Sequence, residues 1–323
     1  MTTRAAIWAI GVVFTIGMLQ SGCAAPGAGS AGSEPTLRRF EFARVVMGSR
    51  ARVVVYAPDE PVDAVRRAFA AIDACDDVLS DYRPRSESRV LAASEAGVWH
   101  DASPLLVDAI ERSRAVWAAS DGAFDITIGP VTALWRVADE TGASPSDDEL
   151  AEARARVGMS LIDVDRARSR VRFRREGMRL DFGGIGKGYA ADLALQALRD
   201  GGLPVALVEI GGDLAVGDAP PGSAGWTVGV SGGGAALVTR VIANEAVATS
   251  GDRFRWTELE DRRASHIFDP SSARPAPGGR PIGVIAPEGW IADAVATVTH
   301  LRGADAGRRT GTALGGVELV VLE

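Results

Sequence analysis

Hydrophobic and polar positions follow two different periods along this chain. Alternation of apolar and polar residues predicts strands over 40–46 and 52–57, on either side of a turn at Met47-Gly48-Ser49. The same reasoning predicts strands over 205–210, 226–230, 237–242 and 281–286, whereas helical spacing predicts helices over 61–79, 104–119, 189–200 and 291–301. The two kinds of element come in clusters instead of alternating strictly. This arrangement favours an α+β fold over a doubly wound sheet.

The first 22 residues have the organisation of a secretory signal peptide. Arg4 precedes an apolar run over 5–19, and Gln-Ser-Gly then leads into Cys23. Small residues directly before a cysteine resemble a bacterial lipoprotein signal, in which the cysteine becomes the acylated N-terminus, although Gln20 stands where leucine is usual. Simple secretion and an uncleaved anchor are the alternatives. We expect a signal over 1–22, a flexible tether over 23–36 and one catalytic domain over 37–323.

Composition and charge narrow the class of protein. Of the 323 residues, 46% are hydrophobic and 24% charged, a balance that excludes a disordered, collagen-like or coiled-coil chain. The formal net charge is −7 and no basic stripe is visible, so nucleic acid is not an expected partner. The two cysteines exclude a disulfide framework. Among 35 basic residues only one is a lysine, Lys187, and the arginines are interpreted as solvated surface.

The densest chemical pattern is the glycine-rich stretch 181–190, Asp-Phe-Gly-Gly-Ile-Gly-Lys-Gly-Tyr-Ala. Glycines followed by a helix start bring backbone N–H groups close to an anion, and Lys187 adds a positive charge. Two known phosphate-binding patterns do not fit this stretch. A P-loop needs glycine at Asp181 and a hydroxyl residue at Gly188, and the dinucleotide-binding fingerprint needs glycine one position beyond Gly188. We interpret the stretch as an anion-binding turn, the alternative being a tight strand-to-helix connection.

Three further sites are candidates for chemistry. Asp293 and Thr297 are spaced i, i+4, so their oxygens share one helix face and suit Mg²⁺, although capping and back-bonding explain them equally well. His266 lies among small and acidic residues and is either a general base or a structural imidazole. Asp125 next to Phe124 offers an acceptor beside an aromatic ring, or a plain turn.

Two other sequence features are less specific. Tyr82 is one of three tyrosines and is either a packing residue or a stacking platform. The pattern Gly-Val-Ser-Gly-Gly over 229–233 matches the nucleophile elbow of serine hydrolases. That motif requires a helix after the serine, and a strand is predicted here, so we expect a hairpin.

The order of these motifs resembles that of the ApbE family, whose members are Mg²⁺-dependent FAD:protein FMN transferases and often periplasmic lipoproteins. The resemblance runs from about Phe40 to the end of the chain. It rests on these segments in order: Met47-Gly48, 79–82, Gly122–Asp125, Gly129-Pro130, Leu134-Trp135, 181–190, Glu209–Asp213, Ala248–Asp252, His266–Pro270, Ala292-Asp293 and Ala296-Thr297. One departure is Ala273, which stands where the family usually has glycine.

The resemblance implies a fold and a set of site residues. The fold is a single large α+β domain with mixed, largely antiparallel sheets flanked by helices. FAD would contact Met47, Tyr82, Ala123, Phe124, Asp125, Asp181, Lys187 and Ile267. The metal would be held by Asp293, Thr297 and the carbonyl of Gly184, and His266 would be the general base.

The implied reaction transfers the FMN part of FAD to a Thr or Ser hydroxyl of an envelope protein and releases AMP. A lipid chain on Cys23 would hold the enzyme at the periplasmic face of a bacterial membrane. Two alternatives use the same residues, a Mg²⁺-dependent FAD pyrophosphatase and a lipoprotein that binds FAD without transferring it.

Overall fold

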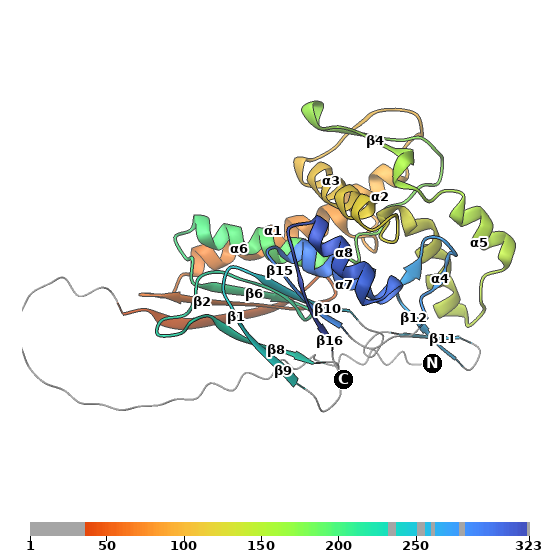
Figure 1. The fold of residues 1–323 in the computed structure, drawn as a ribbon. Helices are drawn as coiled ribbons and strands as arrows, with labels where there is room; N and C mark the ends of the chain where they lie inside the picture. The colour runs from red at the N-terminus through yellow and green to blue at the C-terminus, as the bar shows by residue number, and fades with distance from the viewer. Residues whose placement is uncertain (1–35, 232–236, 251–255, 260–261, 278–281, 322–323) are drawn as a thin grey trace, which may run out of the picture.

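A seven-stranded sheet forms the centre of the computed structural model, which describes residues 36–231, 237–250, 256–259, 262–277 and 282–321 (Figure 1). Its strand order is β1-β2-β6-β7-β10-β15-β16, and every pairing in it is antiparallel. The strands are β1 (Arg38–Val46), β2 (Ser49–Ala57), β6 (Ala206–Ile210), β7 (Asp213–Val216), β10 (Ala246–Ser250), β15 (Ile282–Ala286) and β16 (Glu318–Val321). The expected signal peptide, with Cys23, and all but one residue of the expected tether lie outside the described residues.

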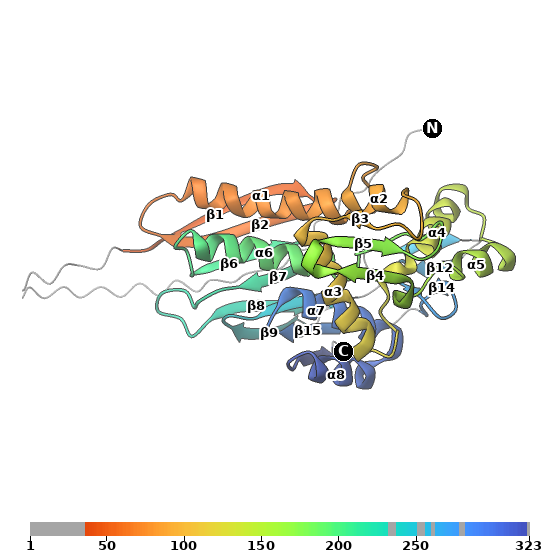
Figure 2. The ribbon, with the colours of Figure 1, turned by 90° about the horizontal axis from the view of Figure 1, so that it is seen from above.

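Helices cover one face of this sheet and a hairpin covers the other. The helices are α1 (Val62–Leu79), α6 (Gly186–Asp200) and α7 (Gly289–Arg302), with α8 (Ala304–Ala313) packed on α7 (Figures 1 and 2). The hairpin is β8 (Trp226–Ser231) and β9 (Leu237–Ile242). The main core lies between sheet and helices, and a second apolar cluster joins Val54, Leu207 and Val216 to Val228 of the hairpin.

The remaining elements gather at one end of the molecule (Figures 1 and 2). They are α2 (Glu87–Ala92), α3 (Pro104–Ala119), α4 (Gly129–Thr141), α5 (Asp147–Arg154), a sheet of β3 (His100–Asp101), β5 (Arg170–Phe173) and β4 (Ile162–Asp165), and the pairs β11 (Trp256–Leu259) with β12 (Arg262–Ser265) and β13 (Phe268–Asp269) with β14 (Arg274–Pro275). No helix in the described part of the chain is both long and apolar enough to cross a membrane.

The predicted elements are confirmed, with small shifts at their ends. The helix predicted over 189–200 begins three residues earlier, at Gly186. Ser231 ends β8, which pairs antiparallel with β9, and this confirms the expected hairpin; residues 232–236, which include the last two of the matched pattern, lie outside the described residues. Among the elements that sequence periodicity missed are the helices α2, α4, α5 and α8 and the central strands β7, β10 and β16. The helix α8 has no long apolar stripe, since only three of its residues, Gly307, Thr310 and Gly311, are buried.

The first turns of α6 and α7 cross in backbone contact. A Cβ added to Gly188 would stand 2.1 Å from the carbonyl oxygen of Gly289, and one added to Gly289 would stand 2.5 Å from the carbonyl oxygen of Gly188. Any side chain at either position would push the two helices apart. Gly188 is therefore required for helix packing, independently of any anion.

This contact predicts that Gly188→Ala is strongly destabilising. Overpacking a well-packed contact costs about 1–3 kcal/mol, and here the neighbour is backbone, which cannot rotate away. Gly186→Ala is a matched control, because its added methyl would meet only Phe182 Cβ at 3.7 Å and Met47 Cε at 4.0 Å. Chemical denaturation of both variants measures the difference, and equal stability would show that the crossing tolerates separation.

Candidate active site

The only lysine of the chain lies between two buried carboxylates. Lys187, the second residue of α6, forms an ion pair with Asp213, and its Nζ is 3.9 Å from Oδ2 of Asp293. The side chains of Asp213 and Asp293 are 3% and 8% exposed. The backbone N–H of Thr249, on β10, also donates to Asp213, at 3.4 Å. Two acids and one cation thus meet where α6, α7, β7 and β10 converge.

Asp213 belongs to this centre although the sequence assigned it no role. Asp213 begins β7 directly after Gly211-Gly212. The sequence feature that could have identified it is therefore a glycine turn followed by a carboxylate. A Cβ on Gly211 would be 3.5 Å from Cδ of Lys187. The lysine stem therefore packs along the turn.

The three residues predicted to hold a metal lie close together. Oδ2 of Asp293 accepts a hydrogen bond from the N–H of Gly188 at 3.2 Å. The Thr297 hydroxyl donates to the Asp293 carbonyl oxygen at 3.3 Å, one helical turn away. A Cβ on Gly184 would be only 2.8 Å from that hydroxyl oxygen. The glycine turn therefore lies directly against the Asp293–Thr297 face of α7.

These donors suit magnesium. Carboxylate, hydroxyl and backbone carbonyl oxygens are hard ligands, and Mg²⁺ is commonly held by one or two carboxylates together with substrate phosphates. Within the described residues, no group of three or more His, Cys, Asp or Glu side chains is placed to hold a metal ion. A magnesium ion here would use oxygens of mixed origin and complete its shell with water or substrate.

A second cluster adjoins the glycine turn through Asp181. Its Oδ1 accepts from the N–H of Gly183 at 2.8 Å, and its Oδ2 lies 3.4 Å from the Arg136 guanidinium. Arg136 also pairs with the buried Asp81 at 2.5 Å and lies 4.1 Å from the centroid of the Tyr82 ring. Tyr82 is 76% exposed, so it is no packing residue and can stack on a planar ligand. Arg136 has no distinguishing sequence pattern and was interpreted, like the other arginines, as solvated surface.

Asp125 has a structural task in addition to any contact with a ligand. Its Oδ1 accepts from both the backbone N–H, at 2.8 Å, and the hydroxyl, at 2.5 Å, of Thr127. Burial raises the pKa of this carboxyl above its ordinary value, although these hydrogen bonds partly oppose the rise. The neighbouring Phe124 is buried, and its ring would lie 3.2 Å from a Cβ on Gly184. Ala123 is buried too.

Met47 reaches the same turn from the sheet. It is half-buried in the β1–β2 connection, has a left-handed backbone with φ 51°, and would lie 4.0 Å from a Cβ on Gly186. The contacts described above therefore bring Met47, Phe124, Gly184, Lys187, Asp293 and Thr297 together, with Asp181 and Tyr82 beside them. Their contacts with FAD and metal stay predictions.

The segment that carries His266 is docked on α4. His266 is exposed after β12, and the carbonyl of the half-buried Ile267 accepts from the N–H of Ala276 at 2.7 Å. Phe268 stacks on Trp135 with ring centroids 5.9 Å apart. These contacts place the segment next to the helix that also carries Arg136.

Trp135 also contacts Ala273, the residue that stands where glycine is usual. Its indole N–H donates to the Ala273 carbonyl at 2.9 Å, and Ala273 is fully buried with φ 56°. That left-handed conformation costs a non-glycine residue roughly 1–2 kcal/mol. The turn is thus kept at some conformational cost, and its geometry does not depend on the glycine.

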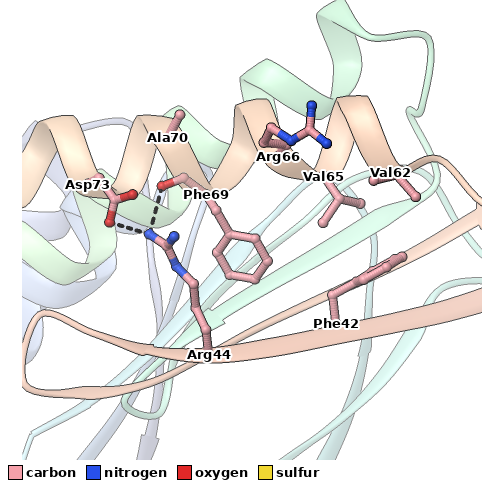
Figure 3. A pocket seen from close by; sticks show the side chains of 8 residues that line it. All are labelled: Phe42, Arg44, Val62, Val65, Arg66, Phe69, Ala70 and Asp73. Carbon is pink, nitrogen blue, oxygen red and sulfur yellow. Dashed lines mark hydrogen bonds and ion pairs between the residues drawn. The ribbon is translucent and has the colours of Figure 1, made fainter.

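The structure also contains a groove that is separate from this site. It has a volume of about 330 Å³ and lies between β1 and α1 (Figure 3). It is lined by Phe42, Arg44, Val62, Val65, Arg66, Phe69, Ala70 and Asp73. Arg44 spans it to reach the carbonyl of Phe69 at 3.2 Å and the carboxylate of Asp73. None of the predicted site residues lines this groove.

The fold is that of solved flavin transferase structures. The chain superposes on the flavinyl transferase ApbE of Pseudomonas stutzeri, apo form, with a TM-score of 0.78 and 27% identity, covering 89% of this chain and 92% of that one. The ApbE protein of Thermotoga maritima gives 0.79 and 28%, covering 88% and 94%.

The sequence agrees with the structural likeness. The FAD:protein FMN transferase of Treponema pallidum is 31% identical over 330 residues, 94% of this chain and 87% of that protein. A Klebsiella pneumoniae protein of the same name is 30% identical over 248 residues, 74% of each chain. The ApbE family model matches residues 47–321, and the chain belongs to the ApbE family.

Proposed function

We propose that this protein transfers the FMN moiety of FAD to a threonine or serine hydroxyl of an acceptor protein and releases AMP. The observation that carries the proposal is the Lys187 ammonium flanked by Asp213 and Asp293, at the point where the glycine turn meets the Asp293–Thr297 face. A cation and hard oxygen donors at one place are what a pyrophosphate substrate requires.

The reaction breaks one bond and forms one bond at phosphorus. The acceptor hydroxyl oxygen bonds to the phosphorus of the FMN part, and the bond from that phosphorus to the bridging pyrophosphate oxygen breaks. That oxygen leaves with AMP. His266 takes the proton of the attacking hydroxyl, since the intrinsic pKa of imidazole is near neutrality.

Magnesium, held by Asp293, Thr297 and the carbonyl of Gly184, would neutralise the phosphate oxygens as charge develops on them. Lys187 supplies a fixed positive charge. Its ion pair with Asp213 holds the ammonium in place before substrate arrives, so little reorganisation is needed in the reaction.

The flavin part of the substrate has its own support. Tyr82 presents an open aromatic face, and the Arg136 guanidinium braces the ring. Met47, Ala123, Phe124, Asp125, Asp181 and Ile267 complete the proposed FAD contacts. The Asp181 carboxylate has one oxygen tied to the turn and the other near Arg136, so it couples the two halves of the site.

The test is incubation of the mature protein with FAD, Mg²⁺ and a candidate envelope acceptor, followed by the intact mass of the acceptor. Asp293→Ala should lower the rate of mass increase roughly 100-fold or more, the scale of losing one charge-stabilising group at a reacting centre. Asp305→Ala is the control, because that carboxylate is 89% exposed on α8. Unchanged turnover of Asp293→Ala would remove the metal assignment.

The same incubation separates the alternatives. Free FMN and AMP with an unmodified acceptor identify a pyrophosphatase, in which water replaces the protein hydroxyl. Intact FAD that stays bound identifies a carrier. Either result contradicts transfer to the acceptor tested.

His266→Ala should slow transfer by about 10²–10⁴-fold, the usual contribution of general acid–base catalysis, and leave FAD affinity nearly unchanged. Single-turnover rates and quenching of flavin fluorescence measure the two quantities separately. Because His266 is exposed, its replacement is not expected to disturb the core. An equal loss of both quantities would identify a structural histidine.

We also propose that Cys23 is acylated after removal of residues 1–22 and anchors the enzyme at the periplasmic face of a membrane. The charged and apolar stretches before it, and the tether after it, support this location. Cys23→Ala should move the protein from the membrane fraction to the soluble fraction. Continued membrane association of this variant would indicate an uncleaved N-terminal anchor.

A further inference from the structure

The helices α6 and α7 cap each other: an aspartate on each accepts hydrogen bonds from backbone N–H groups in the first turn of the other. Asp192 of α6 accepts from the backbone N–H groups of Gly289, at 2.7 Å, and Trp290, at 3.0 Å, the first two residues of α7. Asp293 of α7 in turn accepts from Gly188 N–H in the first turn of α6. Neither helix has a side-chain cap of its own. Each start is therefore satisfied by an acid on the other helix.

The surroundings of Asp192 oppose the ionised form of its carboxyl. Burial raises the pKa of its carboxyl to about 7, although the two N–H groups oppose the rise; nearby Glu288 raises it further and Arg112 lowers it. Arg112 lies over the Trp290 and Tyr189 rings and pairs with Glu288 at 3.1 Å. Since the folded protein holds this proton more tightly than the unfolded chain, the contribution of Asp192 to stability falls as pH rises from about 4 to 7.

We propose that Asp192 is a positioning residue for the metal site. By tying the first two residues of α7 to α6, it sets where Asp293 and Thr297 stand relative to Gly184 and Lys187. The Gly188–Gly289 contact limits how closely the helices approach, and Asp192 limits how far α7 slides or turns. This inference rests on the function proposed above, because it takes Asp293 and Thr297 as metal ligands.

Manganese binding tests the inference without relying on turnover. Mn²⁺ accepts the same oxygen ligands as Mg²⁺, and binding removes the electron paramagnetic resonance signal of the free ion. Asp192→Ala should weaken Mn²⁺ binding roughly 10–100-fold, as expected when a group that orients metal ligands is lost. Asp192→Asn keeps one acceptor oxygen and should recover part of that affinity. Affinity for FAD in EDTA should change little in both variants.

The matched control is Glu149→Ala. Glu149 is also a carboxylate that accepts a helix-start N–H, that of Ser146 at 2.8 Å, but it caps α5, which carries no proposed ligand. It should lower the melting temperature without weakening Mn²⁺ binding.

The inference is overturned if Asp192→Ala binds Mn²⁺ as tightly as the wild type while melting earlier, since Asp192 is then a cap and nothing more. Should Asp192→Ala not fold, Asp192→Asn decides, and wild-type affinity in that variant has the same meaning. Absence of Mn²⁺ binding by the wild type also overturns it. Weakened Mn²⁺ binding together with no flavin transfer by the wild type would refute the proposed function and leave the positioning role standing.

Discussion

Backbone contact between the first turns of α6 and α7 is the constraint on which the site depends. With glycine at both contact positions, the N-termini of two helices approach within a distance that no side chain allows. Two positive helix ends then lie side by side, and the carboxylates of Asp192 and Asp293 compensate them. The glycine turn, the lysine and the Asp293–Thr297 face meet because these two helices meet.

The charged groups around this crossing hold the Lys187 ammonium in one place. Lys187 pairs with Asp213 from the sheet and lies near Asp293 from α7, and its stem packs on the turn at Gly211. Asp213 is buried, so the ion pair is little screened by solvent, and the ammonium is fixed in a site that an anionic ligand can share. A second charged network, built on Asp81 and Arg136, fixes the platform at Tyr82 in a similar way.

Hydrophobic periodicity predicted many of the strands and helices. A strand with one buried face shows alternating residues and a helix with one buried face shows an apolar stripe, and both patterns can be read from a short stretch of sequence. Two of the helices that were missed, α4 and α5, are amphipathic only with respect to a small third cluster around Trp135 and Leu150. Likewise, Asp192 and Arg136 gave no distinct pattern. Each acts through a partner on another element, and sequence spacing does not record such partners.

The sequence by itself determined the α+β class, the family resemblance and the list of residues from Met47 to Thr297 that carry it, because motif order and burial period are local properties. The tertiary structure decided what those residues do to one another. It showed that Gly188 is needed for helix packing, that the one lysine is paired on the sheet side, and that Ala273 adopts a left-handed turn. These facts depend on which elements approach within a few ångströms, and chain folding sets that distance.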